Sequence, residues 1–278
     1  MKVLLIPLYS AALAVALSMS ADLAFANSDW RLLDPENTLI IDTTKGRLII
    51  EMRPEMAPKA VQRVKMLARE KVYDGLQFHR VIALFVAQTG NPNNKDGGGT
   101  AHPNLEPEFT FRYTLAADEA KVLIASRGQD QFSGLMGSVP FQSTPTNAAR
   151  AIRAWGSHCA DTMGMGRNEA LNSANSEIYF MLDATRRLDH DYTLFARVIS
   201  GQEVLRKITL GEPPSEPDLM NSVRVAADMP IAERPVVSVL SGQSLAQLIE
   251  QKRAERGADF SICDISIPVK IDANPNVK

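Results

Sequence analysis

Short runs of β-branched residues separated by turn-forming residues dominate the chain after its N-terminal segment. TLIIDT at 38–43 and RLIIEM at 47–52 are strand patterns, and the glycine in the turn at 44–46 is typical of a tight hairpin because glycine accepts a positive φ. Pro58 then stands at a favourable first helical position, and the apolar residues of 59–71 repeat at helical spacing. The pattern predicts a hairpin followed by a helix that packs one face on the sheet.

The next apolar run, FHRVIALFVAQ at 78–88, contains a histidine and an arginine. It is typical of two short strands, 78–82 and 85–88. Arginine keeps its charge, so Arg80 must lie at a surface, in an ion pair or over a binding cleft. The glycine-rich segment 90–99 that follows lacks the GK[ST] ending of a P-loop and is interpreted as an exposed loop.

The later hydrophobic patterns predict further strands at 162–166, 176–182, 193–200, 223–226 and 236–240. We expect a short helix at 201–208 and a longer one from an N-cap at Ser244 to about Arg256. Residues 262–271 form either a last strand or a loose tail.

Residues 110–158 mix alanine-rich, Gly-Ser and Pro-Thr pieces and include a helix-like stretch at 147–155. We interpret this segment as a lobe inserted into the domain, not as a second domain.

The first 26 residues have the features of a secretory signal peptide. Lys2 precedes an apolar run that ends on Ala24, Phe25 and Ala26, a small-x-small cleavage pattern. An uncleaved anchor is the alternative, but Pro7 interrupts a run that is short of the roughly 20 residues needed to span a bilayer. We expect cleavage after Ala26, a periplasmic or secreted protein, and no stable membrane insertion afterwards.

Charge and cysteine content narrow the function further. The formal net charge is −2, which gives no basic surplus for nucleic acid or an anionic membrane. Cys159 and Cys263 could form a disulfide in an oxidising compartment, or could be two separate buried thiols. Although His158 adjoins Cys159, neither cysteine has the spacing of a structural zinc site.

Several motifs occur in a fixed order: FHRVI, the glycine-rich loop, GMGR, NSANSEIYF, LFARVISG and VLRKI. With this ordered set the chain resembles the cyclophilin family of peptidyl-prolyl cis/trans isomerases over roughly residues 37–208, with a weaker tail to about 240. The resemblance implies a mainly β fold, a closed eight-stranded antiparallel barrel capped by helices at 59–71 and 202–208.

The expected organisation of the chain follows from this resemblance. Residues 1–26 are the signal peptide, and 27–240 are the cyclophilin-like domain with its insertion at about 110–158. Residues 241–278 add a C-terminal helix and tail.

The resemblance also implies an active site. Its catalytic positions are Arg80, Phe85 and Gln88. The implied substrate-binding residues are Phe78, His79, Val86, Gly166, Arg167, Glu177, Tyr179, Leu188 and Tyr192.

The chemistry needs neither a cofactor nor a metal. Rotation about an X–Pro bond is slow because amide resonance raises a barrier of about 18 to 20 kcal/mol. A guanidinium that donates toward the proline nitrogen stabilises the single-bond-like transition state more than the ground states, and this is the role expected of Arg80. Phe85 would hold the proline ring, while Gln88 would orient Arg80 and bind the substrate backbone.

Four positions depart from the family's usual pattern. Val86 replaces a methionine, Glu177 a glutamine, Tyr179 a phenylalanine and Arg187 a tryptophan. An ionised carboxylate only accepts hydrogen bonds, so Glu177 is expected to pair with Arg80 or Arg167.

Two functions remain as hypotheses. The first is an isomerase that speeds the folding of exported proteins by acting on their proline-containing segments. The second is a catalytically weak module or chaperone that holds such segments in the same groove, which Glu177 and Arg187 favour slightly and the intact Arg80, Phe85 and Gln88 oppose. A hydrolase is disfavoured because the chain has no G-x-S-x-G motif.

Overall fold

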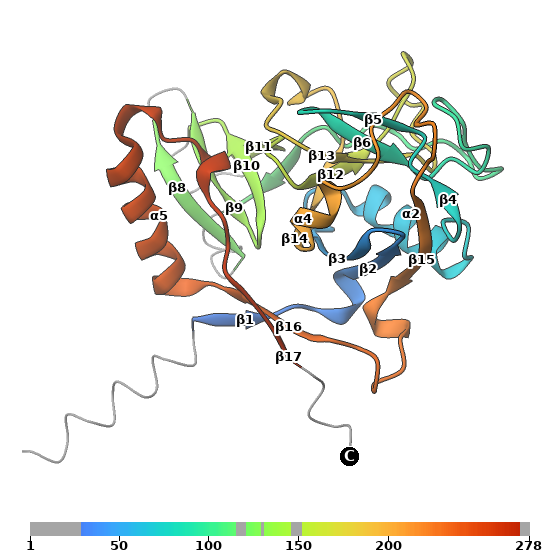
Figure 1. The fold of residues 1–278 in the computed structure, drawn as a ribbon. Helices are drawn as coiled ribbons and strands as arrows, with labels where there is room; N and C mark the ends of the chain where they lie inside the picture. The colour runs from blue at the N-terminus through green and yellow to red at the C-terminus, as the bar shows by residue number, and fades with distance from the viewer. Residues whose placement is uncertain (1–28, 115–120, 129–130, 146–151, 273–278) are drawn as a thin grey trace, which may run out of the picture.

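The computed structural model describes residues 29–114, 121–128, 131–145 and 152–272 (Figure 1). The expected signal peptide and its cleavage site therefore lie outside the described residues. Three antiparallel sheets of nine, five and three strands build the described part of the chain. Among the residues that the structure covers, no helix combines the length and the apolar character needed to cross a membrane.

The nine-stranded sheet curls around the main core. Its strands, in spatial order, are β4 (Leu76–Gln77), β15 (Leu219–Val225), β2 (Thr38–Thr43), β3 (Gly46–Met52), β14 (Leu194–Ser200), β12 (Thr162–Met165), β13 (Ile178–Met181), β6 (Val86–Thr89) and β5 (Arg80–Ile82). The predicted first hairpin is confirmed as β2 and β3, and Gly46 in its turn has a φ of 137°.

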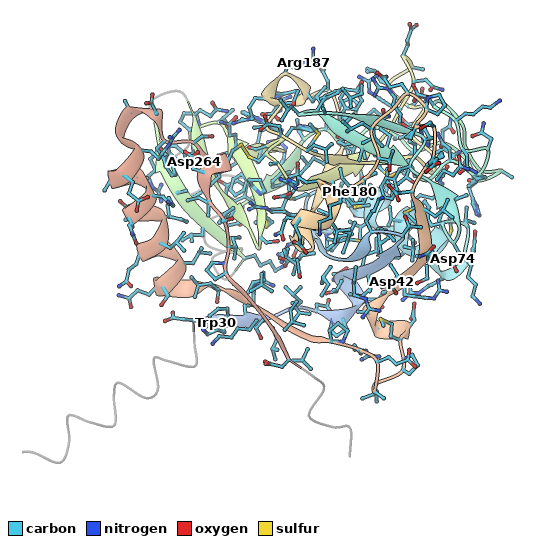
Figure 2. All side chains as sticks on the ribbon, viewed as in Figure 1. Trp30, Asp42, Asp74, Phe180, Arg187 and Asp264 are labelled. Carbon is cyan, nitrogen blue, oxygen red and sulfur yellow. A yellow bond between two sulfur atoms is a disulfide. The ribbon has the colours of Figure 1, made fainter. Side chains whose placement is uncertain are left out.

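Helix α2 (Pro58–Arg69) confirms the first predicted helix and begins at the predicted proline. Its buried side chains, among them Val61 and Val64, share one apolar core with the strands of the large sheet. Phe180 of β13 lies in the same core and is labelled in the interior of Figure 2. The short helix α4 (Gln202–Leu205) confirms the second predicted helix over a shorter span.

The expected mainly β fold is confirmed, but the closed eight-stranded barrel is not. The large sheet has nine strands, and no ladder joins its outer strands β4 and β5 among the described residues. The free edge of β5 meets only a single bridge, Val81 to Gly211. Pro213 and Pro214 follow this bridge and have no amide hydrogen, so the loop cannot extend it into a ladder.

The segment expected to be an inserted lobe forms the five-stranded sheet. Its order is β7 (Phe111–Tyr113), β11 (Ile152–Gly156), β10 (Val139–Ser143), β9 (Phe132–Met136) and β8 (Val122–Arg127). The helix-like pattern at 147–155 is wrong where the residues are described: Ile152 and Ala154 are buried, Arg153 between them is exposed, and β11 pairs with strands on both sides. The proposed division of the chain into domains stays a prediction.

Helix α5 (Gly242–Arg256) lies along β8 on the outer side of this sheet (Figure 1). Leu245 and Ile249 of the helix share a core with Ala125 and Leu135 of the sheet. The helix begins before the predicted N-cap: Ser241 precedes it, and Ser244 lies in its first turn, where its hydroxyl donates to Asp29 Oδ2 at 2.6 Å. The short 3-10 helices are η1 (Pro35–Asn37), η2 (Arg186–Leu188), η3 (Ala226–Asp228), η4 (Gly257–Asp259) and η5 (Ile262–Asp264).

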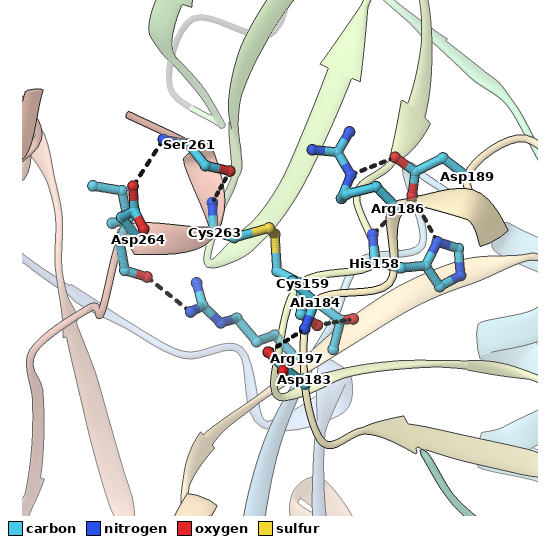
Figure 3. The surroundings of a disulfide bond; sticks show 12 residues. His158, Cys159, Asp183, Ala184, Arg186, Asp189, Arg197, Ser261, Cys263 and Asp264 are labelled. Carbon is cyan, nitrogen blue, oxygen red and sulfur yellow. Dashed lines mark hydrogen bonds and ion pairs between the residues drawn. A yellow bond between two sulfur atoms is a disulfide. The ribbon is translucent and has the colours of Figure 1, made fainter. Parts of the chain in front are cut away.

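The third sheet joins both ends of the described chain. Strand β16 (Val236–Leu240) lies between β1 (Trp30–Leu32) and β17 (Val269–Asp272). The segment 262–271 is thus a strand only over its last residues. Between η5 and the five-stranded sheet, Cys159 and Cys263 form a disulfide, which decides between the two alternatives left open by the sequence (Figure 3).

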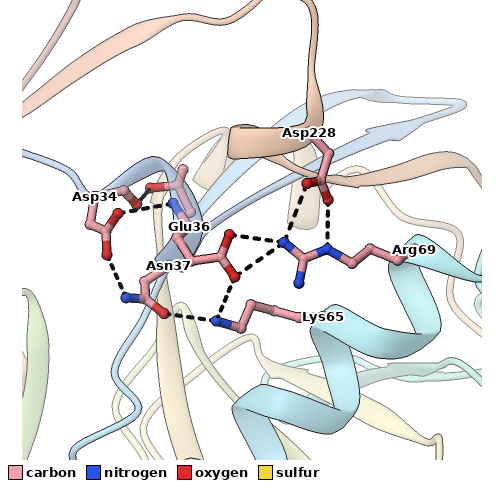
Figure 4. A network of polar contacts seen from close by, with 7 residues as sticks. Asp34, Glu36, Asn37, Lys65, Arg69 and Asp228 are labelled. Atoms are coloured by element: carbon pink, nitrogen blue, oxygen red, sulfur yellow. Dashed lines mark hydrogen bonds and ion pairs between the residues drawn. The ribbon is translucent and has the colours of Figure 1, made fainter.

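A polar network holds the outer face of α2 to the two 3-10 helices η1 and η3 (Figure 4). Arg69 Nη2 donates to Glu36 at 2.8 Å, and its Nε donates to Asp228 at 2.8 Å. Lys65 Nζ donates to the same Glu36 at 3.1 Å. The charged groups of Arg69, Glu36 and Asp228 are exposed, so their ion pairs orient the N-terminal arm but contribute little to stability.

Candidate active site

The antiparallel pair β5 and β6 brings the three predicted catalytic residues together. Arg80 lies directly opposite Gln88 in the register, and paired residues project from the same face of a sheet. Arg80 Nη1 donates a hydrogen bond to Gln88 Oε1, and the guanidinium lies 6.0 Å from the ring centroid of Phe85. The tight turn at 83–85 that joins the strands places Phe85 beside the pair.

A groove opens over this pair. Its walls comprise Arg80, Phe85, Val86, Gln88, Asp96, Gly166, Arg167, Tyr179, Leu188 and Tyr192. All three predicted catalytic residues and six of the predicted substrate-binding residues are therefore in one place. Asp96 was missed because the loop that contains it was interpreted only as exposed.

Phe78, His79 and Glu177 do not line the groove. Phe78 is fully buried in the main core, where its ring centroid lies 6.3 Å from that of Phe180. His79 and Glu177 are buried behind the groove, with exposed fractions of 3% and 5%. They belong to the layer that supports the groove wall.

Glu177 sets the orientation of Gln88. Gln88 Nε2 donates to Glu177 Oε1 at 2.7 Å, and Asn91 Nδ2 and the amide of Gly97 donate to the other carboxylate oxygen. Because a carboxylate only accepts, Gln88 must turn its NH₂ group to Glu177 and its carbonyl oxygen to Arg80. The expected pairing of Glu177 with Arg80 or Arg167 is absent among the described contacts, and Glu177 acts on Arg80 only through Gln88.

Arg80 has a second partner that the sequence did not reveal. Its Nε donates to Glu212 Oε2 at 2.7 Å, from the loop before β15. The Arg80 side chain is 26% exposed and that of Glu212 is 53% exposed. Two acceptors on different sides of the guanidinium therefore restrict its orientation at the edge of the groove.

Cationic side chains border the aromatic part of the groove. The guanidinium of Arg187 lies 5.4 Å from the Phe85 centroid, and that of Arg167 lies 4.5 Å from the Tyr192 centroid. Arg187, a departure from the family's usual tryptophan, thus still contacts the ring expected to hold proline. The rim of the groove is positively charged where it is also aromatic.

A buried chain of hydrogen bonds fixes the Tyr179 wall. Tyr179 Oη lies 2.8 Å from His158 Nε2, and His158 Nδ1 lies 2.8 Å from Asp189 Oδ1. Arg186 Nε donates to the other oxygen of Asp189 at 2.6 Å (Figure 3). Burial raises the pKa of Tyr179 well above its usual value, so its hydroxyl stays protonated and can donate to His158.

This chain predicts an effect of pH on stability. Burial alone would raise the pKa of Asp189, but the hydrogen bonds from His158 together with the nearby charge of Arg186 leave that pKa lowered. A carboxylate with a lowered pKa stabilises the fold above its unfolded-state pKa of about 3.9, and the contribution is lost as the pH falls through the folded-state pKa.

We expect Asp189→Asn to lower the free energy of unfolding at pH 7 by about 1 to 3 kcal/mol, since a charged hydrogen bond is removed. The difference from wild type should begin to shrink below about pH 4, where the carboxylate of the unfolded chain binds a proton, and should be lost as the pH falls through the lowered pKa of the folded state. Urea unfolding across this pH range measures it, with the exposed Asp259→Asn as control. A difference that is independent of pH would contradict the assignment.

Comparison with known proteins gives a consistent picture. Residues 38–227 match the family described as cyclophilin type peptidyl-prolyl cis-trans isomerase/CLD. A probable peptidyl-prolyl cis-trans isomerase of Brucella suis is 31% identical over 200 residues, covering 70% of this chain and 85% of that protein. A peptidyl-prolyl cis-trans isomerase of Schizosaccharomyces pombe is 28% identical over 170 residues, covering 61% of this chain and 83% of that one.

A solved structure matches more of the chain. The crystal structure of cyclophilin AquaCyp293 from Hirschia baltica superposes with a TM-score of 0.80 and 26% sequence identity, covering 92% of this chain and 98% of that one. This coverage extends past residues 38–227, so the likeness in fold includes parts of the chain outside the family match.

Proposed function

The chain belongs to the cyclophilin-type peptidyl-prolyl cis-trans isomerases, and from that premise we propose that it catalyses X–Pro rotation in exported proteins with Arg80 as the electrostatic group. The observation that carries the proposal is the convergence of Arg80, Phe85 and Gln88 on one groove. An apolar ring beside a fixed cation suits proline, whose ring is apolar and whose nitrogen becomes more basic as the amide twists.

Arg80 retains donors for this task. A guanidinium has five N–H groups, and the described hydrogen bonds to Gln88 and Glu212 use two of them. As conjugation is lost, the lone pair of the proline nitrogen localises and can accept a hydrogen bond that the planar amide cannot. A donor already held in place stabilises this state without reorganising, so the rotation barrier falls.

The other groove residues hold the two sides of the bond. Phe85 and the apolar wall of Val86 and Leu188 would enclose the proline ring, while Tyr179, fixed by His158, closes the far side. The positive rim at Arg167 and Arg187 favours substrates with acidic residues beside the proline. Proline-containing segments of unfolded proteins are thus the proposed partners.

We further propose that the protein works outside the cytoplasm, in the periplasm or after secretion. The N-terminal sequence supports this with its charged, apolar and small-residue regions. The disulfide between Cys159 and Cys263 adds support, because such bonds persist in oxidising compartments. Slow proline isomerisation limits the folding of many proteins there, which gives the activity a role.

A coupled assay on a short X–Pro peptide tests the proposal. We expect the wild type to exceed the uncatalysed rate. Phe85→Ala should raise KM by about tenfold, because the proline ring of the substrate loses part of its apolar contact. The matched control is Leu84→Ala, since Leu84 is adjacent in the turn but 78% exposed and outside the groove.

Two results would count against this proposal. A wild type that binds the peptide without accelerating rotation would favour the holding module instead of the enzyme. An equal KM in Phe85→Ala and Leu84→Ala would show that Phe85 does not bind the proline ring.

A further inference from the structure

His79 has an unusual environment for a buried histidine. Its side chain is only 2% exposed, and among the described residues neither ring nitrogen has a hydrogen-bond partner. Nε2 lies 3.6 Å from Glu177 Oε2, which is too far for a hydrogen bond. Buried polar atoms are almost always satisfied, so a nitrogen that faces a carboxylate across such a gap points to a missing partner between them.

Asp96 is the third group at this point. One ligand atom each from His79, Asp96 and Glu177 lie within 4.8 Å of one another. The amide of Gly97, the next residue after Asp96, donates to Glu177 Oε2 at 3.3 Å and so holds the loop against the carboxylate. A buried carboxylate, a buried imidazole and an exposed carboxylate therefore converge from three segments distant in sequence.

Glu177 has capacity for one more partner. Its two oxygens offer about four acceptor positions. Three are used by Gln88 Nε2, Asn91 Nδ2 and the amide of Gly97. The remaining position is on Oε1. The oxygen nearest His79 is Oε2, where an ion would take the place of the longest of these hydrogen bonds, the 3.3 Å one from the amide of Gly97.

We propose that His79, Glu177 and Asp96 form a binding site for a divalent transition-metal ion such as zinc. An imidazole nitrogen with two carboxylates suits zinc and related ions better than Mg²⁺ or Ca²⁺, which prefer oxygen alone. Zinc–ligand bonds of about 2.0 to 2.2 Å place tetrahedral ligand atoms about 3.3 to 3.5 Å apart. The buried pair at 3.6 Å is close to this spacing, and the exposed Asp96 side chain can rotate to complete it.

The site goes beyond the isomerase reaction, which needs no metal. It also lies directly behind the catalytic pair, because Glu177 Oε1 holds the amide of Gln88. The ion would fix Glu177, and through Gln88 it would restrict Arg80.

Isothermal titration with ZnCl₂ in a non-chelating buffer, without peptide, tests the site. We expect one zinc ion per chain for the wild type. Glu177→Gln keeps the size of the side chain but removes the charge, and should weaken binding by roughly a hundredfold or more, since even outer partners of ligands contribute 10- to 100-fold. Asp96→Asn, at an exposed position, should weaken it by at least about tenfold without disturbing the fold.

The matched control is His102→Gln. His102 Nε2 and Glu70 Oε2 lie 2.9 Å apart in an exposed pair, which is a second place where zinc could bind adventitiously. This variant should bind zinc as the wild type does. The proposal is overturned if the wild type takes up no zinc at millimolar concentration, if both carboxylate variants bind as tightly as wild type, or if His102→Gln abolishes binding. Because no substrate is present, these results are independent of isomerase activity.

Discussion

Arg80→Ala is expected to lower kcat/KM on an X–Pro peptide by about 10²- to 10³-fold, the usual effect of removing a donor that acts on a developing charge. The side chain lies at the edge of the groove, not in the core, so the fold should survive the change. The coupled peptide assay measures the rate, and unfolding by urea checks the stability. Peptide affinity should change much less, because Phe85 and Tyr179 remain in the groove.

Two further variants sharpen this experiment. Arg80→Lys keeps the charge but loses the forked donor geometry, so it should recover only part of the rate. Arg253→Ala removes an exposed arginine of α5. This helix packs on the five-stranded sheet and does not line the groove, so the variant should keep the wild-type rate. If Arg80→Ala stayed within about twofold of the wild type, the electrostatic role of Arg80 would be wrong.

The double variant Cys159→Ala/Cys263→Ala should lower the free energy of unfolding by about 3 to 5 kcal/mol. The disulfide spans a sequence separation of 104 residues, and closing a loop of that size removes much of the entropy of the unfolded chain. In the folded state the same segment is also held by Arg197, whose buried Nη2 donates to the carbonyl of Ile265 at 2.8 Å, two residues past Cys263. Urea unfolding by circular dichroism measures the change.

Reduction provides the control for this prediction. Wild type in dithiothreitol should unfold at the urea concentration of the untreated double variant, and dithiothreitol should not shift the variant. An unchanged midpoint on losing both cysteines would show that the C-terminal segment is held by its packing alone.

The sequence predicted correctly those helices and strands that are specified by residues close together in the chain. The β2–β3 hairpin has glycine in its turn, and α2 has proline at its start and an apolar stripe, so neither needs distant contacts to be recognised. The insertion differs, because β11 is a strand only through its partners β7 and β10. The wrong N-cap prediction at Ser244 also comes from a distant contact. Its hydroxyl, which is suited to capping a helix, donates instead to Asp29, 215 residues away in the sequence.

The candidate active site likewise contains residues that a local motif predicts and residues that only distant contacts bring in. Arg80, Phe85 and Gln88 lie within one strand pair, so a single motif predicted all three. Glu212 and Asp96 come from loops whose sequences contain no sign of the groove, and only the fold brings them to it. Phe78 and His79 were placed in the groove with Arg80, but they lie between β4 and β5 and turn inward to the core and to Glu177.

The small sheet of β1, β16 and β17 determines where the two ends of the described chain lie relative to the groove. Trp30 and Asp272, near the two ends of the described chain, lie on the strands that flank β16. Figure 2 shows Trp30 on the opposite side of the molecule from Arg187, which contacts Phe85 in the groove. A tether, tag or immobilising surface joined at either end of the described chain therefore leaves the groove facing outward and open to proline-containing peptides.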